Sequence, residues 1–131
     1  MARARLAPSL KQLRTEVDVA WPMRSKRSDG WIGDAAHLAR TSDHNPDADG
    51  IVHALDITAD GINVRRLVVD CTHHEAVWYV ISGGWLYSRT HDFVGVPYHG
   101  RDPHVTHVHV NIRHSPEAEM SSRRWLSPTD E

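Results

Sequence analysis

The sequence has little of several features that mark common classes of protein. It has one cysteine, Cys71, which excludes an internal disulfide bond and any cysteine-rich zinc site. Its 15 Lys and Arg against 17 Asp and Glu give a net charge of −2 without a long basic run, so the electrostatic pattern of a nucleic-acid-binding protein is missing. No stretch approaches the ~18 consecutive apolar residues of a membrane-spanning helix. We therefore expect neither nucleic acid as a partner nor insertion into a membrane.

Length and composition predict one globular domain. Of the 131 residues, 40% are hydrophobic and 24% are charged, which excludes a disordered, collagen-like or coiled-coil chain. A chain of this length buries about two thirds of its surface, so it needs no disulfide or metal merely to fold. We expect a single domain over residues 1–131, with a peripheral tail from about residue 114.

Hydrophobic periodicity predicts both helices and strands. Ser9 and Gln12 have the spacing of a capping box, and Pro22 ends the following helix at or before Trp21. Cys71 falls on the apolar face of a second helix and is expected to be a buried small hydrophobe. The expected helices are 9–21, 64–71 and a short one within 115–126, and the expected strands are 51–57, 76–82, 85–87 and 107–112. This order predicts a small α+β domain, with an antiparallel or mixed sheet flanked by helices.

Histidine is unusually frequent, with 11 residues in the chain. It is the commonest side chain for binding metals and for moving protons near neutral pH. His107 and His109 are two apart on an expected strand, so they project from one face while the valines between and after them project to the other. The pair indicates either a solvated strand face or a functional site.

A second group of polar residues precedes and interrupts the expected strand 51–57. Asp56 lies in an otherwise apolar run, so it must be paired, hydrogen-bonded or bound to a metal. His44 lies before a turn that would return it to the start of the same strand. One imidazole, one carboxylate and a second imidazole from the last strand make the ligand set of a catalytic zinc site with an open fourth position.

These residues lie in two segments, RTSDHNPDADGIVHALDIT (40–58) and YHGRDPHVTHVHVNI (98–112). Both resemble the zinc peptidoglycan peptidases that share the Hedgehog/D-Ala-D-Ala-peptidase fold, in particular short endolysin-like peptidases of phages. The resemblance runs from about Leu13 to Ile112. It implies that fold and one Zn²⁺ bound by His44, Asp56 and His109, with Ser42 and Asp43 ordering His44.

The chain also departs from this family. Many of its members have a carboxylate two or three residues before the last metal ligand, where this sequence has His107 and Thr106. His107 is therefore the candidate general base, with His104 second, as in the related penicillin-insensitive murein endopeptidases, which have extra histidines at this place. Imidazole titrates near pH 6.5, which suits proton transfer at neutral pH.

Other polar residues have a functional and a structural interpretation. Arg40 can hold a substrate carboxylate or form an ordinary salt bridge, and Ser42 and His99 can line the substrate cleft. His73 and His74 are expected at a polar helix end, where a positive charge complements the helix dipole. His53 points away from Asp56 on the expected strand and is predicted to be structural. Trp78, Tyr79 and Trp85 are expected to pack in the core and the hairpin rather than to stack on glycan.

The predicted function is hydrolysis of an amide bond in the stem peptide or cross-link of peptidoglycan. The first ten residues lack the apolar run of a signal peptide, so we expect synthesis in the host cytoplasm and release to the cell wall through a holin. The alternative is a non-catalytic, zinc-stabilised binding module of the same fold. The missing carboxylate base favours this alternative, and His104 and His107 beside the ligand count against it.

Overall fold

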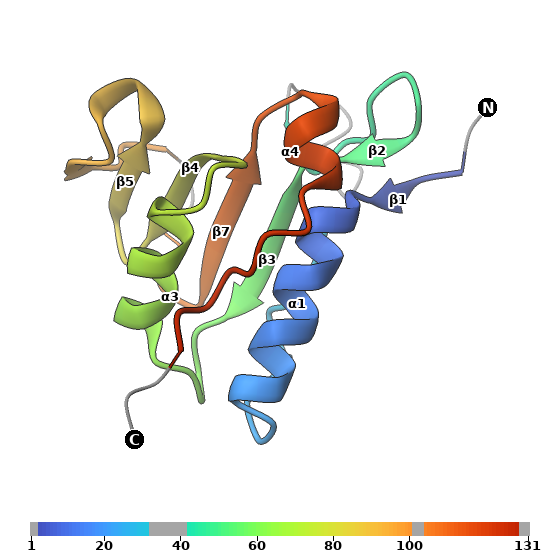
Figure 1. Ribbon diagram of the computed structural model, residues 1–131. Coiled ribbons are helices and arrows are strands. Elements are labelled where there is room, and N and C mark those ends of the chain that lie inside the picture. The colour runs from blue at the N-terminus through green and yellow to red at the C-terminus, as the bar shows by residue number, and fades with distance from the viewer. Residues whose placement is uncertain (1–2, 32–41, 101–103, 129–131) are drawn as a thin grey trace.

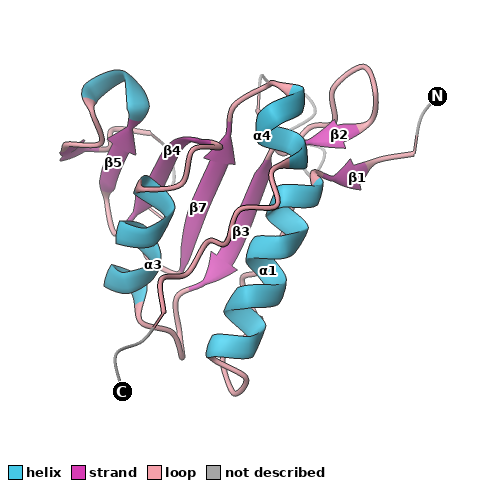
Figure 2. Cartoon of the chain, in the orientation of Figure 1, coloured by secondary structure: helices cyan, strands magenta, loops and turns pink. Residues whose placement is uncertain are grey.

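The computed structural model describes residues 3–31, 42–100 and 104–128. These segments contain both helices and a five-stranded antiparallel sheet, so the α+β class predicted from the sequence is confirmed (Figure 2). In chain order the elements are β1 (Arg5–Leu6), α1 (Pro8–Ala20), β2 (Ile51–Val52), β3 (Ala54–Thr58), α3 (Val64–Thr72), β4 (Val77–Ser82), β5 (Trp85–Ser88), the 3₁₀ helix η1 (Arg89–His91), β6 (Gly95–Pro97), β7 (His107–Ile112) and α4 (Pro116–Met120). No described helix has both the length and the hydropathy that crossing a membrane requires.

Five of the described strands form one antiparallel sheet in the order β3-β7-β4-β5-β6. The last strand in the sequence, β7, therefore lies in the sheet between two earlier strands, β3 and β4. A separate parallel pair joins β1 to β2. The expected strand 51–57 is interrupted at His53, whose amide donates to the Asp43 carbonyl, so β2 pairs with β1 while β3 pairs with β7.

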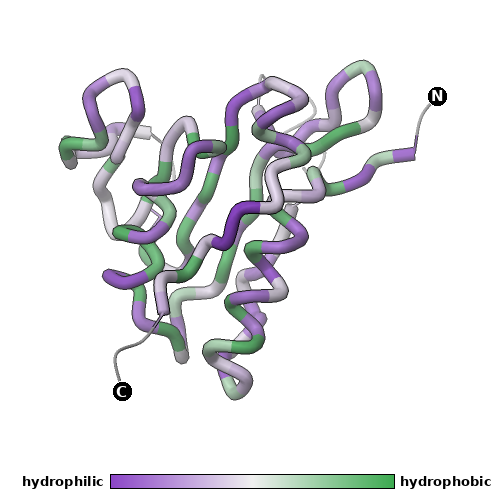
Figure 3. The backbone as a smooth tube through the Cα atoms, viewed as in Figure 1, coloured by the Kyte–Doolittle hydropathy of each residue, from purple (hydrophilic) through white to green (hydrophobic). Residues whose placement is uncertain are grey.

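Helices α1 and α3 lie on the same face of this sheet (Figure 1). Leu10, Leu13 and Val17 of α1 are fully buried, and Leu67 and Cys71 of α3 are buried beside them, as the helical spacing predicts. Figure 3 shows hydrophobic and hydrophilic residues alternating along α1, with hydrophobic stretches along the strands behind it. The side chains that project from the other face of the sheet are therefore available for a site.

Helix α1 begins differently from the prediction. Pro8 occupies the first helical turn after Ala7, which leaves Ser9 inside the helix rather than at its cap. The Ser9 hydroxyl donates to the Ala118 carbonyl at 2.6 Å, and Gln12 donates to carbonyls of Ser122 and Arg123. The capping-box prediction is therefore wrong, because both side chains bind the C-terminal segment instead of the helix end.

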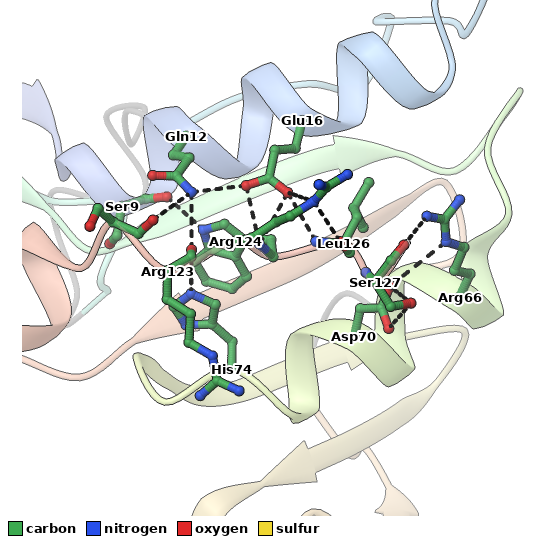
Figure 4. A network of polar contacts seen from close by, with 12 residues as sticks. Ser9, Gln12, Glu16, Arg66, Asp70, His74, Arg123, Arg124, Leu126 and Ser127 are labelled. Atoms are coloured by element: carbon green, nitrogen blue, oxygen red, sulfur yellow. Dashed lines mark hydrogen bonds and ion pairs between the residues drawn. The ribbon is translucent and has the colours of Figure 1, made fainter. Parts of the chain in front are cut away.

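The C-terminal segment packs into the molecule, contrary to the peripheral tail that the sequence predicts. Trp125 and Leu126 are only 3% and 4% exposed, and their amides donate to the carboxylate of Glu16 in α1 (Figure 4). Because these amides bond to a side chain, the chain is not helical there, and the expected helix within 115–126 is limited to α4. Ser127 then binds Asp70 of α3, so the segment joins the two large helices.

Candidate metal centre

The face of the sheet opposite the helices holds a group of histidines and carboxylates. Asp56 in β3 and His109 in β7 are directly paired residues in neighbouring antiparallel strands, so their side chains project from the same face. Leu55 and Ile57, which alternate with Asp56, are paired with Val110 and Val108 and are buried under the helices. The alternation in β3 and β7 therefore separates a hydrophobic core face from a polar face, as predicted.

His44 reaches this face from the turn that precedes β2. Its amide donates to the Ser42 hydroxyl oxygen at 3.3 Å, and the Asn45 amide donates to the Ser42 carbonyl at 3.0 Å. Ser42 therefore shapes the turn that carries His44, in the role that the sequence suggests. The turn closes when the Asp47 amide donates to the Ile51 carbonyl, which returns the chain to β2.

His44, Asp56 and His109 form what we call the metal cluster. His44 Nε2 lies 3.2 Å from Asp56 Oδ2, and His109 Nδ1 lies 3.0 Å from Asp56 Oδ1. One ligand atom from each residue lies within 4.8 Å of the others. Bonds of about 2.0–2.1 Å to a tetrahedral ion separate neighbouring ligand atoms by roughly 3.3 Å. Since both histidines are 94% buried and the spacing is near this value, the cluster can hold a metal ion.

The second nitrogen of each histidine has a hydrogen-bond partner. His44 Nδ1 lies 3.1 Å from the carbonyl oxygen of Trp31, which is held in place because Gly30 pairs with Asp56 at the edge of β3. His109 Nε2 lies 3.1 Å from Asn111 Oδ1, and the Asn111 amide group donates to Asp43. Such partners fix the tautomer and orientation of a metal-binding imidazole. Both ligands are therefore held with one nitrogen directed at Asp56.

Asn111 was missed by the sequence analysis, although a signal was present. It follows His107 and His109 at the same period of two in β7, so all three project from the polar face. Asp43, expected to order His44, binds Asn111 and lies 2.9 Å from His114 Nε2. Asp43 thus supports His109 through Asn111. Tyr79, which the sequence predicts to pack in the core or the hairpin, stacks on His109 with ring centroids 5.6 Å apart.

The charges in the cluster stabilise one another. Burial alone would raise the pKa of Asp56, but hydrogen bonds from His109 and His44 outweigh it and hold the pKa of this carboxyl far below its usual range. Burial lowers the pKa of His44, but the hydrogen bond to Asp56 and its negative charge outweigh that and raise it. Asp56 is therefore an ionised carboxylate, the form that binds a cation.

The two candidate catalytic histidines lie beside the cluster. His107 Nε2 is 3.7 Å from Asp56 Oδ2, and the Thr106 hydroxyl lies 3.2 Å from His107 Nδ1. The His104 ring meets the His107 ring edge to face at 4.8 Å. Asp56, His104 and His107 also have ligand atoms within 4.8 Å of one another. Four imidazoles therefore gather around one carboxylate.

The structure brings some of the other predicted residues to the site and not others. His99 is exposed, and within the described residues no hydrogen bond, ion pair or ring contact joins it to the cluster. Arg40 lies outside the described residues. His53 is fully buried and structural, as predicted, with Nε2 2.6 Å from a carboxylate oxygen of Glu119.

Two predictions about polar and aromatic residues are wrong in part, although His73 is the exposed C-cap of α3 and Trp85 lies in the β4–β5 hairpin, as predicted. His74 is 2% exposed and stacks on Trp125 at 3.7 Å, so it is not a charged residue at an exposed helix end. Trp78 and Trp85 are 42% and 47% exposed and lie outside the core. His74 is buried because the C-terminal segment covers it, and Trp78 is exposed where the pairing of β4 with β7 shifts register.

Comparisons of the chain with protein-family models, with curated proteins and with solved structures found no match. The function of the chain is therefore inferred from the residues of the metal cluster and their surroundings.

Proposed function

We propose that the protein is a zinc-dependent peptidase that hydrolyses an amide bond of the peptidoglycan stem peptide or cross-link. The observation that carries this proposal is the convergence of His44, Asp56 and His109, from three separate segments, with His104 and His107 beside them. Two imidazoles and one carboxylate are the ligand set of many catalytic zinc sites. The resemblance of residues 40–58 and 98–112 to peptidoglycan peptidases supports the choice of substrate.

The residues of the site fit zinc by their chemistry. Two imidazole nitrogens and one carboxylate oxygen are borderline-soft and hard donors that Zn²⁺ accepts readily, whereas Mg²⁺ and Ca²⁺ prefer oxygen alone. Asp56 contributes one negative charge, and a dication held there leaves a net positive charge beside a developing oxyanion. When bound, zinc lowers the pKa of a coordinated water and polarises a carbonyl group.

The neighbouring histidines supply the proton transfers. His107 Nε2, close to Asp56 Oδ2, can accept the proton of an attacking water molecule, and Thr106 helps to orient the ring. The water oxygen forms the new bond to the carbonyl carbon and gives a tetrahedral adduct. The amide nitrogen then takes a proton from His107, or from His104, whose ring contacts His107, as the C–N bond breaks and the amine departs. No carboxylate is needed for these steps.

The experiment is mass analysis of purified muropeptides incubated with zinc-loaded protein. The expected result is a pair of products, one with a new amine and one with a new carboxylate, that together gain one water. His109→Ala and chelated wild type should give no products. His91→Ala is the matched control, because His91 is an exposed histidine of η1, and it should retain activity.

A non-catalytic, zinc-stabilised binding module is the second candidate. The observation that favours it is the closeness of His104 and His107 to Asp56, since either histidine can act as a fourth metal ligand instead of moving protons. A structural zinc site has four protein ligands and no position for water. Intact muropeptides in every sample, with one zinc bound per chain, would support this candidate and contradict the peptidase.

A further inference from the structure

The polar face of the sheet extends beyond the metal cluster along β4. The pairing of β4 with β7 shifts register between Val77 and Tyr79, so Trp78 is the extra residue of a β-bulge. Val77 is buried in the core and Tyr79 stacks on His109 on the opposite face. The bulge lets Trp78 leave the core as well, and its ring lies 6.0 Å from that of Tyr79. An exposed tryptophan therefore lies next to Tyr79, the ring that stacks on the candidate metal ligand His109.

Beside Trp78 is a cavity of about 340 Å³, lined by Trp78, Arg89, Thr90, Arg113 and His114, which we call the arginine pocket. A main-chain carbonyl group holds its two arginines in place. Nε and Nη2 of Arg113 both donate to the Glu75 carbonyl, and Nη2 of Arg89 donates to the same oxygen at 3.2 Å. One carbonyl oxygen therefore holds two guanidinium groups close together.

Neither guanidinium has a carboxylate partner among the described residues, whereas Arg24, Arg66 and Arg124 each lie within 4.0 Å of one. The Nη1 groups of Arg89 and Arg113 have no hydrogen bond within the described part of the chain. Burial, and then the charge of Arg113, lower the pKa of Arg89. Two like charges held together without a counter-charge are destabilising unless an anion joins them.

We propose that the arginine pocket binds a carboxylate of the peptide substrate, with the Trp78 ring covering the adjacent apolar part of the chain. A planar carboxylate matches the paired N–H donors of guanidinium groups, and Thr90 adds a hydroxyl. The inference rests on the proposed function, because it takes the stem peptide, which contains several free carboxylates, as the ligand.

The position of the pocket suits a substrate that reaches the metal cluster. Ring centroids lie 6.0 Å apart from Trp78 to Tyr79 and 5.6 Å apart from Tyr79 to His109. Roughly three residues of extended peptide cover such a path. His114 provides a second connection, since it lines the pocket and lies 2.9 Å from Asp43, which holds Asn111. A carboxylate bound in the pocket would therefore fix which amide of the stem peptide reaches the cluster.

The test compares stem peptides that differ only in one carboxyl group. The probes are a tetrapeptide with all carboxylates free and versions in which either the D-glutamate α-carboxyl or the C-terminal carboxyl is a carboxamide. Dissociation constants are measured by calorimetry on zinc-loaded full-length protein, and kcat/KM is measured on the same peptides. One amidation should weaken wild-type binding roughly tenfold, the value of a charged hydrogen bond.

Arg113→Gln should bind the free and amidated peptides equally, and Trp78→Ala should weaken both. Arg124→Gln is the control, because Arg124 is 71% exposed in the C-terminal segment, away from the pocket, and should keep the preference. Thermal unfolding of each variant separates loss of binding from loss of folding. Thr90→Val, at an exposed residue of the pocket, removes the hydroxyl and should reduce the preference for the free carboxylate. Equal binding of all peptides by the folded wild type would overturn the inference. A carboxylate preference without hydrolysis would keep it and refute the peptidase.

Discussion

The metal cluster and a second group, formed by Asp47, His53 and Glu119, contain similar side chains in different arrangements. In the metal cluster the nitrogen–oxygen separations are 3.2 and 3.0 Å, close to the spacing around a tetrahedral ion. In the second group His53 Nε2 lies 2.6 Å from Glu119 and 3.9 Å from Asp47. The first distance is that of a short hydrogen bond, and the second exceeds the separation of neighbouring ligand atoms around a tetrahedral ion.

The second nitrogens of the histidines differ in the same way. Both imidazoles of the metal cluster have their other nitrogen held by a neighbour, whereas His53 Nδ1 has no hydrogen-bond partner among the described residues. His53 is fully buried and stacks on His114 at 3.9 Å. Its contact with Glu119 connects the position between β2 and β3 to α4. The two groups therefore share residue types but differ in spacing and in the outer partners that orient a metal-binding imidazole.

Removal of a metal ligand should have the largest effect on this contrast. Asp56→Asn and His109→Ala each remove a donor from the metal cluster, so bound zinc should fall from one ion per chain to near zero and hydrolysis should fall to background. Glu119→Gln should leave one zinc per chain, because we expect the 2.6 Å contact between His53 and Glu119 to be an internal hydrogen bond and not part of a metal site. Elemental analysis of dialysed protein measures both. A wild type with two ions per chain, reduced to one in Glu119→Gln, would refute the distinction.

Loss of an outer partner should weaken metal binding without abolishing it. Asn111→Leu removes the group that contacts His109 Nε2, so zinc affinity should fall about 10- to 100-fold. Competition with a chromophoric chelator gives the affinity. Ser88→Ala is the control, since Ser88 is also a buried polar residue but lies in β5, and its affinity should equal wild type. Unchanged affinity in Asn111→Leu would show that His109 needs no orientation.

Breaking the second group should cost stability instead. Glu119→Ala leaves the buried His53 nitrogen without its partner and should lower the free energy of unfolding by about 1–3 kcal/mol, with zinc still bound. Glu117→Ala changes an exposed glutamate of the same helix and should cost less than about 0.5 kcal/mol. Urea unfolding at pH 7 compares the two. Equal stabilities would show that the pair between His53 and Glu119 contributes nothing.

The contrast also explains what the sequence could predict. Alternation in β7 and the charge at Asp56 were sufficient to predict the polar face, because the side-chain direction in a strand depends only on position. The metal cluster followed because its donors lie on paired strands and one short turn. Local sequence patterns do not predict contacts between residues far apart in the chain. Three features depend on such contacts: the bulge at Trp78, the burial of His74 and the packing of Trp125.

His74 extends the comparison to a buried histidine whose hydrogen bonds are all to the main chain. Its Nδ1 accepts from the Ala76 amide and its Nε2 donates to the Arg123 carbonyl, so the ring is neutral. Burial lowers the pKa of His74 and outweighs the hydrogen bond to the Arg123 carbonyl, which raises it; the charge of Arg123 lowers it further, and Glu75 and Glu16 raise it. A proton on Nδ1 would face an N–H group at 3.1 Å, which opposes protonation in the folded state.

The smallest expected effect is a pH dependence of stability caused by this residue. Because the folded pKa of His74 is lowered, the unfolded chain binds the proton first, and stability falls as pH decreases below about 6.5. The contribution is at most about 1.4 kcal/mol per pH unit and is absent above that pH. His74→Phe keeps a ring on Trp125 and should flatten the wild-type curve between pH 6.5 and 5 in urea unfolding, whereas His73→Gln, at an adjacent and more exposed histidine, should not. If both variants gave the wild-type slope, the acid sensitivity would belong to other histidines, and His74 would differ from them only in its packing.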